Sequence, residues 1–237
     1  MKAIKAVVFD LDGTLINSKH DYPEMAGRVE TILKDEGVQT GEFNKPRRIW
    51  EIIQGGITSL KELGLPPNRI DCILGQITEA LNAVELLALD SVEPVPGAHE
   101  TLLYLRRGGF KIGIATRSGG EYAERSLNIA AFTEYIDVLL ARDEVEHPKP
   151  DPRHLLQVIT TLSVSPQNVV YVGDTTTDYM AAKKANIAFI GFPRNDEWKK
   201  RLKEAGCQVL VSKLPDITDI IEDRMDIFIK DPVTSTN

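Results

Sequence analysis

The sequence has few of the features that mark secreted or membrane proteins. It contains two cysteines, Cys72 and Cys207, so a disulfide framework is not expected, and their positions lack the spacing of metal ligands. No apolar run approaches the roughly 20 residues that cross a membrane. The chain begins directly with a strand-like segment rather than with a signal-peptide pattern. These absences favour a cytoplasmic protein that does not act at a membrane.

Basic residues are also fewer than acidic residues. The chain has 28 Lys and Arg against 35 Asp and Glu, which gives a formal net charge of -7 and a pI of about 5.2. This balance argues against non-specific binding of nucleic acid, and a phosphate ligand would need positive potential focused at one place. There is no internal repeat or low-complexity segment. With 237 residues, the chain is expected to form one large domain or a domain with an insertion.

Two aspartates near the N-terminus follow an apolar run. Residues 7–15 are typical of a buried strand that leads into a turn, with Asp10 and Asp12 at its end. Strand side chains alternate, so both carboxylates are predicted to point the same way. Their burial and mutual repulsion would be relieved by a cation. Gly13 permits a sharp turn and Thr14 adds a hydroxyl, although an exposed Asp-Gly turn is the simpler alternative.

Polar residues follow two later segments. Thr116 ends the apolar run Ile112–Ala115, and N–H groups at such a strand-to-helix turn favour phosphate. A hydroxyl residue there could also be a plain helix cap. Lys149 lies between Pro148 and Pro150, in a stiff segment that cannot be the middle of a helix. A solvated loop lysine is the alternative.

A parallel sheet would bring these residues together. Apolar runs alternate with amphipathic stretches from Asp90 onward, which predicts an α/β fold with a doubly wound, mainly parallel sheet. The strands expected in this region are 110–115, 136–141, 169–172, 187–192 and 208–211. Ligands bind beyond the carboxyl ends of such strands. Asp10, Thr116 and Asp174 are all expected there, with Asp178 one helical turn after Asp174.

Four motifs in this order resemble the haloacid dehalogenase-like (HAD) superfamily. They are Asp10-Leu11-Asp12-Gly13-Thr14, Thr116-Arg117-Ser118, Lys149-Pro150, and Gly173-Asp174 with Asp178. The first motif is specific by itself, and the others gain weight from their order at strand ends. The resemblance spans about the whole chain and implies a Rossmann-like HAD core.

The resemblance also implies roles for these residues. Asp10 would be the nucleophile that forms an aspartyl-phosphate, and Asp12 would act as general acid and then as general base. Mg²⁺ would be held by Asp10, the main-chain carbonyl of Asp12, and Asp174. Asp178 would orient Lys149 or a metal-bound water. The residues implied in phosphate binding are Gly13, Thr14, Thr116, Arg117 through its main-chain N–H, and Lys149.

Three positions depart from the usual HAD pattern. Asn17 stands where an aspartate frequently follows the first motif. Arg117 stands where an asparagine is common, which places a long cationic side chain near the rim of the expected site. Asn186 replaces the glycine usually found after the fourth-motif helix. Because asparagine tolerates a left-handed backbone, Asn186 is expected to end that helix. None of the three departures removes a catalytic group.

A helical insertion is expected after the first strand. Residues 17–91 show no strand-like alternation, and their apolar residues repeat at helical spacing. The insertion resembles the C1-type cap of HAD phosphatases, including phosphoglycolate phosphatase-like members. The expected domains are therefore residues 1–16 and 92–237 as the catalytic core and residues 17–91 as the cap. A helical subdomain packed permanently on the core is the alternative.

The insertion also carries the candidates for substrate specificity. Lys45, Arg47 and Arg48 form a basic cluster with Trp50 nearby, which would suit a second anionic group on the substrate. A solvated surface patch explains the same residues equally well. Gly55 and Gly56 are expected to break a helix into a loop over the site.

Asp12 narrows the reaction class. HAD dehalogenases and phosphonoacetaldehyde hydrolases lack an acid at that position, so its presence favours transfer between oxygens. The leading hypothesis is a cytoplasmic, Mg²⁺-dependent phosphatase for a small phosphorylated metabolite such as phosphoglycolate. The alternatives are a phosphomutase of the β-phosphoglucomutase type and a non-catalytic regulator that binds a phosphoryl ligand. Monomer and homodimer both remain open.

Overall fold

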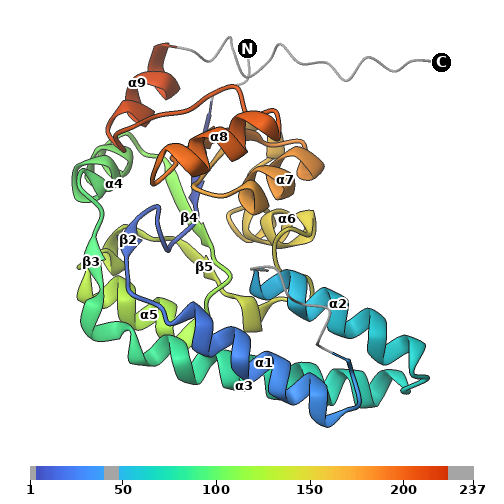
Figure 1. Cartoon of the computed structure of the whole chain (residues 1–237). Helices are drawn as coiled ribbons and strands as arrows, with labels where there is room; N and C mark the ends of the chain where they lie inside the picture. Colours follow the sequence, from blue (N-terminus) through green and yellow to red (C-terminus); the bar gives the residue numbers. More distant parts are fainter. Residues whose placement is uncertain (1–3, 40–47, 224–237) are drawn as a thin grey trace, which may run out of the picture. The chain divides into compact units, whose positions relative to one another are not determined.

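The computed structural model describes residues 4–39 and 48–223. The chain forms two compact units, Met1–Ser18 with Val92–Asn237 and Lys19–Ser91. We call them the core unit and the helical unit (Figure 1). Within the described residues, no helix combines the length and the apolar character needed to span a membrane.

The core unit is built on a five-stranded parallel sheet. Its strands are β1 (Ala6–Phe9), β4 (Lys111–Ala115), β5 (Val138–Leu140), β6 (Val169–Gly173) and β7 (Ala188–Gly191). Their order is β5-β4-β1-β6-β7, and all neighbours run parallel. The central strand β1 is wholly apolar and buried, as expected for a parallel sheet that is covered on both faces. The predicted α/β fold is confirmed.

Helices flank this sheet. They are α4 (Ala98–Arg107), α5 (Gly120–Ile129), α6 (Pro152–Thr161), α7 (Thr176–Ala185), α8 (Asp196–Glu204) and α9 (Asp216–Asp223). The helix α6 packs on β4 and β5, and α7 packs on β6 and β7. Thr175 caps the start of α7, and Asn186 ends it in the left-handed conformation, at φ 55°, as its sequence position predicts. The two-residue strands β2 (Ile16–Asn17) and β3 (Glu93–Pro94) pair antiparallel as a separate two-stranded sheet.

The prediction of a strand at residues 208–211 is wrong. The segment forms a single bridge between Leu210 and Gly191. Gly191 donates a hydrogen bond to the carbonyl of Val209 and accepts one from the N–H of Val211. Because β7 ends at Gly191, the segment has no further strand residues beside it with which to continue a ladder.

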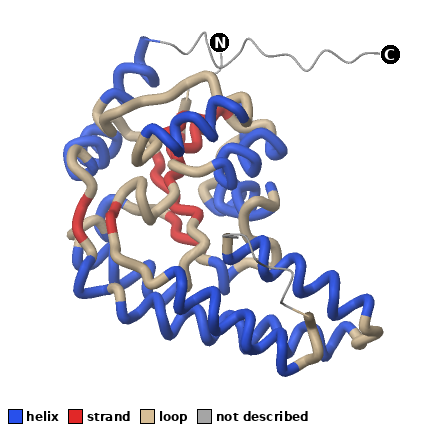
Figure 2. The backbone as a smooth tube through the Cα atoms, in the orientation of Figure 1, coloured by secondary structure: helices blue, strands red, loops and turns tan. Residues whose placement is uncertain are grey.

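The helical unit consists of α1 (Tyr22–Asp35), α2 (Ile49–Glu62) and α3 (Pro67–Leu87), followed by a short 3-10 turn at Leu89–Ser91 (Figure 2). Residues of the three helices share an apolar core that includes Val29, Leu33, Ile52, Leu60, Ile73 and Ile77. The expected break at Gly55-Gly56 is wrong, because α2 continues through both residues. A Cβ atom on Gly56 would lie 2.5 Å from Cδ1 of Leu33. The glycine therefore allows α1 and α2 to pack closely.

Candidate active site

The site lies at the carboxyl ends of the three central strands. Asp10 follows β1, Thr116 follows β4 and Asp174 follows β6. The strands pair in register with β1 at the centre, so these three residues emerge at the same edge of the sheet. The predicted convergence of segments that are distant in sequence is therefore observed.

The ammonium group of Lys149 joins two carboxylates at this edge. Its Nζ lies 2.8 Å from Oδ1 of Asp10, 2.7 Å from Oδ1 of Asp178 and 2.7 Å from the hydroxyl of Tyr171. Burial alone would lower the pKa of Lys149, but Asp10 and Asp178 outweigh it and hold that pKa above its ordinary value. Burial would raise the pKa of Asp178, whereas Lys149 brings it below the usual range. Lys149 and Asp178 therefore form a charged pair.

His154 and Tyr171 support this lysine, and residue spacing carries no signal for either role. Nδ1 of His154 accepts the main-chain N–H of Lys149 at 3.2 Å, and Nε2 lies 3.0 Å from the carbonyl of Leu140. Burial and then Lys149 lower the pKa of His154 to about 4, so its ring is neutral and its Nε2–H is the donor to Leu140. Tyr171 donates its hydroxyl to Oδ1 of Asp178 at 2.7 Å. Lys149 is thus held at its main chain and at its side chain.

Three carboxylates are crowded together beside this lysine. One oxygen from each of Asp10, Asp174 and Asp178 lies within 4.8 Å of the others. Burial raises the pKa of Asp10 to about 6 against the opposing effect of Lys149. Burial and then Asp10 raise the pKa of Asp174 well above its ordinary value. Such crowding favours a bound cation, because a cation would stabilise the ionised forms.

The hydrogen bonds indicate which of these oxygens could hold a metal. Both carboxylate oxygens of Asp174 are buried, and neither accepts a hydrogen bond from the described residues. Nε of Arg194 nevertheless lies 2.6 Å from Oδ2 of Asp174 as an ion pair. Asp178 is already engaged by Lys149, Tyr171 and Thr175. Oxygen donors of this kind fit Mg²⁺, and Asp10 and Asp174 have the more available atoms.

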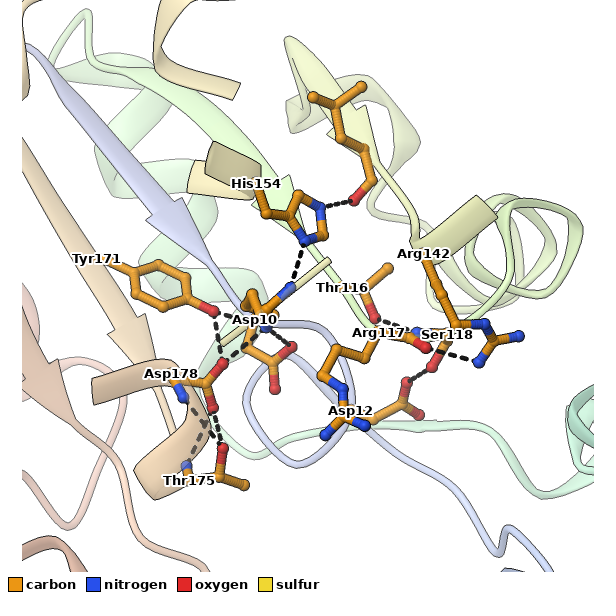
Figure 3. A network of polar contacts seen from close by, with 12 residues as sticks. Asp10, Asp12, Thr116, Arg117, Ser118, Arg142, His154, Tyr171, Thr175 and Asp178 are labelled. Carbon is orange, nitrogen blue, oxygen red and sulfur yellow. Dashed lines mark hydrogen bonds and ion pairs between the residues drawn. The ribbon is translucent and has the colours of Figure 1, made fainter. Parts of the chain in front are cut away.

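The carboxylate of Asp12 has a separate environment. Ser118 donates its hydroxyl to Oδ2 at 2.7 Å, and Tyr122 and Ser18 each donate to Oδ1 at 2.8 Å. In Figure 3, Asp12 lies beside Ser118, apart from the group formed by Asp10, Tyr171 and Asp178. Strand alternation does not determine how Asp10 and Asp12 point relative to each other, because β1 ends at Phe9, so their alignment stays a prediction. Asp12 lies outside the carboxylate group, which leaves the main-chain carbonyl as its implied metal ligand.

The turn after β1 requires its glycine. Gly13 has φ 84°, and a Cβ atom there would lie 2.6 Å from Oδ2 of Asp174 and 2.8 Å from Cδ of Arg194. The next residue, Thr14, is fully buried, and its hydroxyl has no hydrogen-bond partner among the described residues. An unpaired buried hydroxyl at this position is suited to a phosphate oxygen.

The turn after β4 places the second-motif residues. Thr116 is buried, and its hydroxyl accepts the main-chain N–H of Ser118 at 3.1 Å. The carbonyl of Arg117 accepts a hydrogen bond of 2.7 Å from Arg142 (Figure 3). Arg142 therefore fixes the backbone of this turn. Its role, like those of Ser118 and Tyr122, depends on contacts between distant segments, which residue spacing does not reveal.

The candidate specificity residues belong to the helical unit. Lys45 and Arg47 lie outside the described residues. Arg48 precedes α2, and its main-chain N–H donates to the side chain of Glu51 at 3.2 Å. Trp50 lies in the first turn of α2, and its indole N–H has no hydrogen-bond partner in the described part of the chain.

Comparison with known proteins shows the family of this chain. Residues 7–192 match the model of the haloacid dehalogenase-like hydrolase family. The chain belongs to this family. It is 29% identical to the pyrophosphatase PpaX of Halalkalibacterium halodurans over 92% of this chain and 97% of that protein. It is 26% identical to a phosphoglycolate phosphatase of Nitrosospira multiformis over 92% of this chain and 96% of that protein.

A solved structure shares the same fold. The crystal structure of a putative β-phosphoglucomutase from Thermotoga maritima superposes with a TM-score of 0.60 at 26% identity. The match covers 93% of this chain and all of that one. The likeness to haloacid dehalogenase-like proteins therefore includes the helical insertion as well as the sheet.

Proposed function

We propose that the protein is a Mg²⁺-dependent phosphatase that hydrolyses a small phosphorylated metabolite through an aspartyl-phosphate on Asp10. The observation that carries this proposal is the buried contact of Lys149 with Asp10 and Asp178, next to the buried carboxylate of Asp174, whose oxygens accept no hydrogen bond from the described residues. Similar proteins named as a pyrophosphatase and a phosphoglycolate phosphatase support it.

The metal would be held by Asp10, Asp174 and the main-chain carbonyl of Asp12. When bound, Mg²⁺ would neutralise charge between the anionic nucleophile and the anionic phosphoryl group. The phosphoryl oxygens would be held by Lys149, by the main-chain N–H of Arg117 and by the hydroxyls of Thr14 and Thr116. Gly13 would let the backbone approach them closely.

Asp10 and Asp12 would divide the bond changes between them. A carboxylate oxygen of Asp10 bonds to phosphorus, the ester oxygen departs, and Asp12 gives that oxygen a proton. Asp12 then takes a proton from water, which attacks phosphorus and releases inorganic phosphate from Asp10. Because hydroxyls both donate and accept hydrogen bonds, Ser18, Ser118 and Tyr122 can hold Asp12 in either protonation state.

The helical insertion would select the substrate. As a cap over residues 1–16 and 92–237, the segment 17–91 would exclude bulk water and restrict the reaction to small esters. Arg47, Arg48 and Trp50 are the candidate specificity residues of this cap. A cytoplasmic monomer or homodimer fits this function, with no nucleic acid or membrane as partner.

The test is phosphate release from a panel of small phosphate esters, with Mg²⁺ and with a chelator. We expect the wild type to release phosphate with Mg²⁺ and not with the chelator. Asp10→Asn should lower turnover by on the order of a thousandfold or more, because it removes the nucleophile. The matched control is Asp71→Asn, which makes the same change at an exposed position on α3 and should leave turnover unchanged.

Two other outcomes would replace this proposal. Isomerisation of a sugar phosphate without phosphate release would indicate a phosphomutase, a possibility favoured by the likeness to the putative β-phosphoglucomutase structure. Binding of phosphate esters without turnover, unaffected by Asp10→Asn, would indicate a phosphoryl-binding regulator.

A further inference from the structure

Arg194 reaches into the candidate site from a loop that none of the four motifs includes. It lies between β7 and α8, and its Nε is 2.6 Å from Oδ2 of Asp174. The side chain of Asp174 is 0% exposed, whereas that of Arg194 is 37% exposed. The arginine thus connects a fully buried acid to the surface.

The surroundings of Arg194 are shaped to hold its side chain in this position. The missing Cβ of Gly13 leaves room for its Cδ and Nε, which would lie 2.8 Å from such an atom. On α8, the ring of Trp198 lies 5.7 Å from the guanidinium carbon, within the range of a cation–π contact. These contacts on two sides indicate that the side chain of Arg194 is held in position rather than freely solvated.

The charges at the site indicate what Arg194 does. Lys149 forms ion pairs with Asp10 and Asp178, and Arg194 forms one with Asp174, so two cations face three carboxylates in these pairs. A divalent cation on Asp174 would compete with Arg194 for the same carboxylate, because two cations so close repel each other. A phosphorylated substrate would then restore negative charge and offer the guanidinium a new partner.

We propose that Arg194 is a substrate-binding residue: Asp174 releases it when the divalent cation binds, and its guanidinium then binds a second anionic group of the substrate. This inference rests on the phosphatase function proposed above and specifies its substrate class. The substrates are phosphate esters or anhydrides that carry a further carboxylate or phosphate. The planar fork of arginine suits both groups, whereas Lys149 and the motif residues serve the phosphoryl group that is transferred.

The first experiment measures metal binding without turnover. Mg²⁺ is titrated calorimetrically into chelator-stripped wild type, Arg194→Gln, Arg194→Lys and Arg201→Gln. Arg201 is the matched control, because it also lies over Trp198 but pairs with Glu197. Removal of the competing charge should tighten Mg²⁺ binding by Arg194→Gln on the order of tenfold. Arg194→Lys and Arg201→Gln should stay near the wild type. Equal Mg²⁺ affinity of Arg194→Gln and wild type would overturn the proposed displacement of Arg194 from Asp174 by Mg²⁺. An equal gain of Mg²⁺ affinity in Arg201→Gln would overturn it as well.

The second experiment measures substrate preference. The kcat/KM is compared for phenyl phosphate, which has no second anionic group, and for phosphoglycolate and pyrophosphate, which have one. Arg194→Gln should lose about tenfold or more on the doubly anionic compounds relative to phenyl phosphate, the loss expected for one charge-assisted hydrogen bond. Arg194→Lys should recover part of this preference.

The two experiments separate this inference from the function on which it rests. An equal loss on all three compounds would overturn substrate binding by Arg194 while the phosphatase function stands. Absence of turnover by the metal-loaded wild type on the whole panel would overturn both the phosphatase function and the substrate class. The calorimetric result would still decide whether Arg194 and Mg²⁺ compete for Asp174.

Discussion

The two units of the chain bury different kinds of side chain. The core unit buries Asp10, Lys149, Asp174 and Asp178 at the end of its sheet. The helical unit is held by an apolar cluster, and Glu85 is the one charged side chain buried among its described residues. Burying charge costs stability unless each group is paired. Burial of these charged groups therefore costs the core unit stability at the candidate active site, whereas the helical unit is stabilised mainly by apolar packing.

Each unit carries its own fluorescent reporter, which makes the comparison measurable. The chain has two tryptophans, Trp50 in the helical unit and Trp198 in the core unit. A Trp50→Phe background reports urea unfolding of the core unit, and a Trp198→Phe background reports the helical unit. Each substitution below is expected to change mainly the signal of its own unit.

The largest effect is expected for Lys149→Met. The substitution leaves Asp10 and Asp178 buried without their cation, which should cost about 3–5 kcal/mol in the free energy of unfolding. The double variant Lys149→Met/Asp178→Asn should be destabilised by less than the sum of the two single variants, since one of the two uncompensated carboxylates is gone. Urea unfolding followed through Trp198 measures both. Additive effects would show that the buried pair is not coupled.

The next effect depends on pH and concerns His154. Its pKa in the folded protein is about 4, below the ordinary 6.5, so the unfolded chain takes up the proton first as pH falls. Stability should therefore decline between pH 6.5 and 4, by at most about 3 kcal/mol from this residue. His154→Asn should remove this part of the slope in urea unfolding at a series of pH values.

A smaller effect tests the packing of the helical unit. Gly56→Ala places a Cβ atom 2.5 Å from Leu33, so it should destabilise this unit by about 1–3 kcal/mol. Gly75→Ala, on α3, meets no atom within 4 Å and should be neutral or stabilising by up to about 1 kcal/mol. Trp50 fluorescence reports both. If the two substitutions had the same effect on stability, the close approach of α1 and α2 would not explain why position 56 is a glycine.

The smallest effect is expected for an exposed ion pair. Arg69 on α3 pairs with Glu36 after α1, and the arginine side chain is 46% exposed. Arg69→Gln should change the stability of the helical unit by less than about 1 kcal/mol, and salt should reduce the difference further. A loss as large as that of Lys149→Met would contradict the contrast between the two units.

The sequence predicted the sheet and the residues at its strand ends because both depend on local patterns. Apolar runs identified β1, β4 and β6, and a parallel sheet necessarily places Asp10, Thr116 and Asp174 at one edge. The helices of the insertion followed from the spacing of apolar residues in the same way.

Other features depend on contacts that no local pattern contains. Arg194, Tyr171 and His154 acquire their partners only when distant segments meet in the fold. The directions of Asp10 and Asp12 could not be inferred from alternation, because the strand ends one residue earlier, at Phe9. Gly56 was interpreted as a helix breaker, but tertiary packing against Leu33 outweighs its low helix propensity.

The most direct test of the central claim is detection of phosphate on Asp10. The wild type and Asp12→Asn are mixed with Mg²⁺ and a substrate identified from the ester panel, quenched in acid within one turnover, digested and analysed by mass spectrometry. The account predicts phosphate on the peptide that contains Asp10 in the wild type, and slower formation of it in Asp12→Asn, which lacks the acid for the leaving oxygen as well as the base that activates water. Turnover by the wild type with no phosphate on Asp10 in either protein, or with phosphate on another residue, would contradict the account.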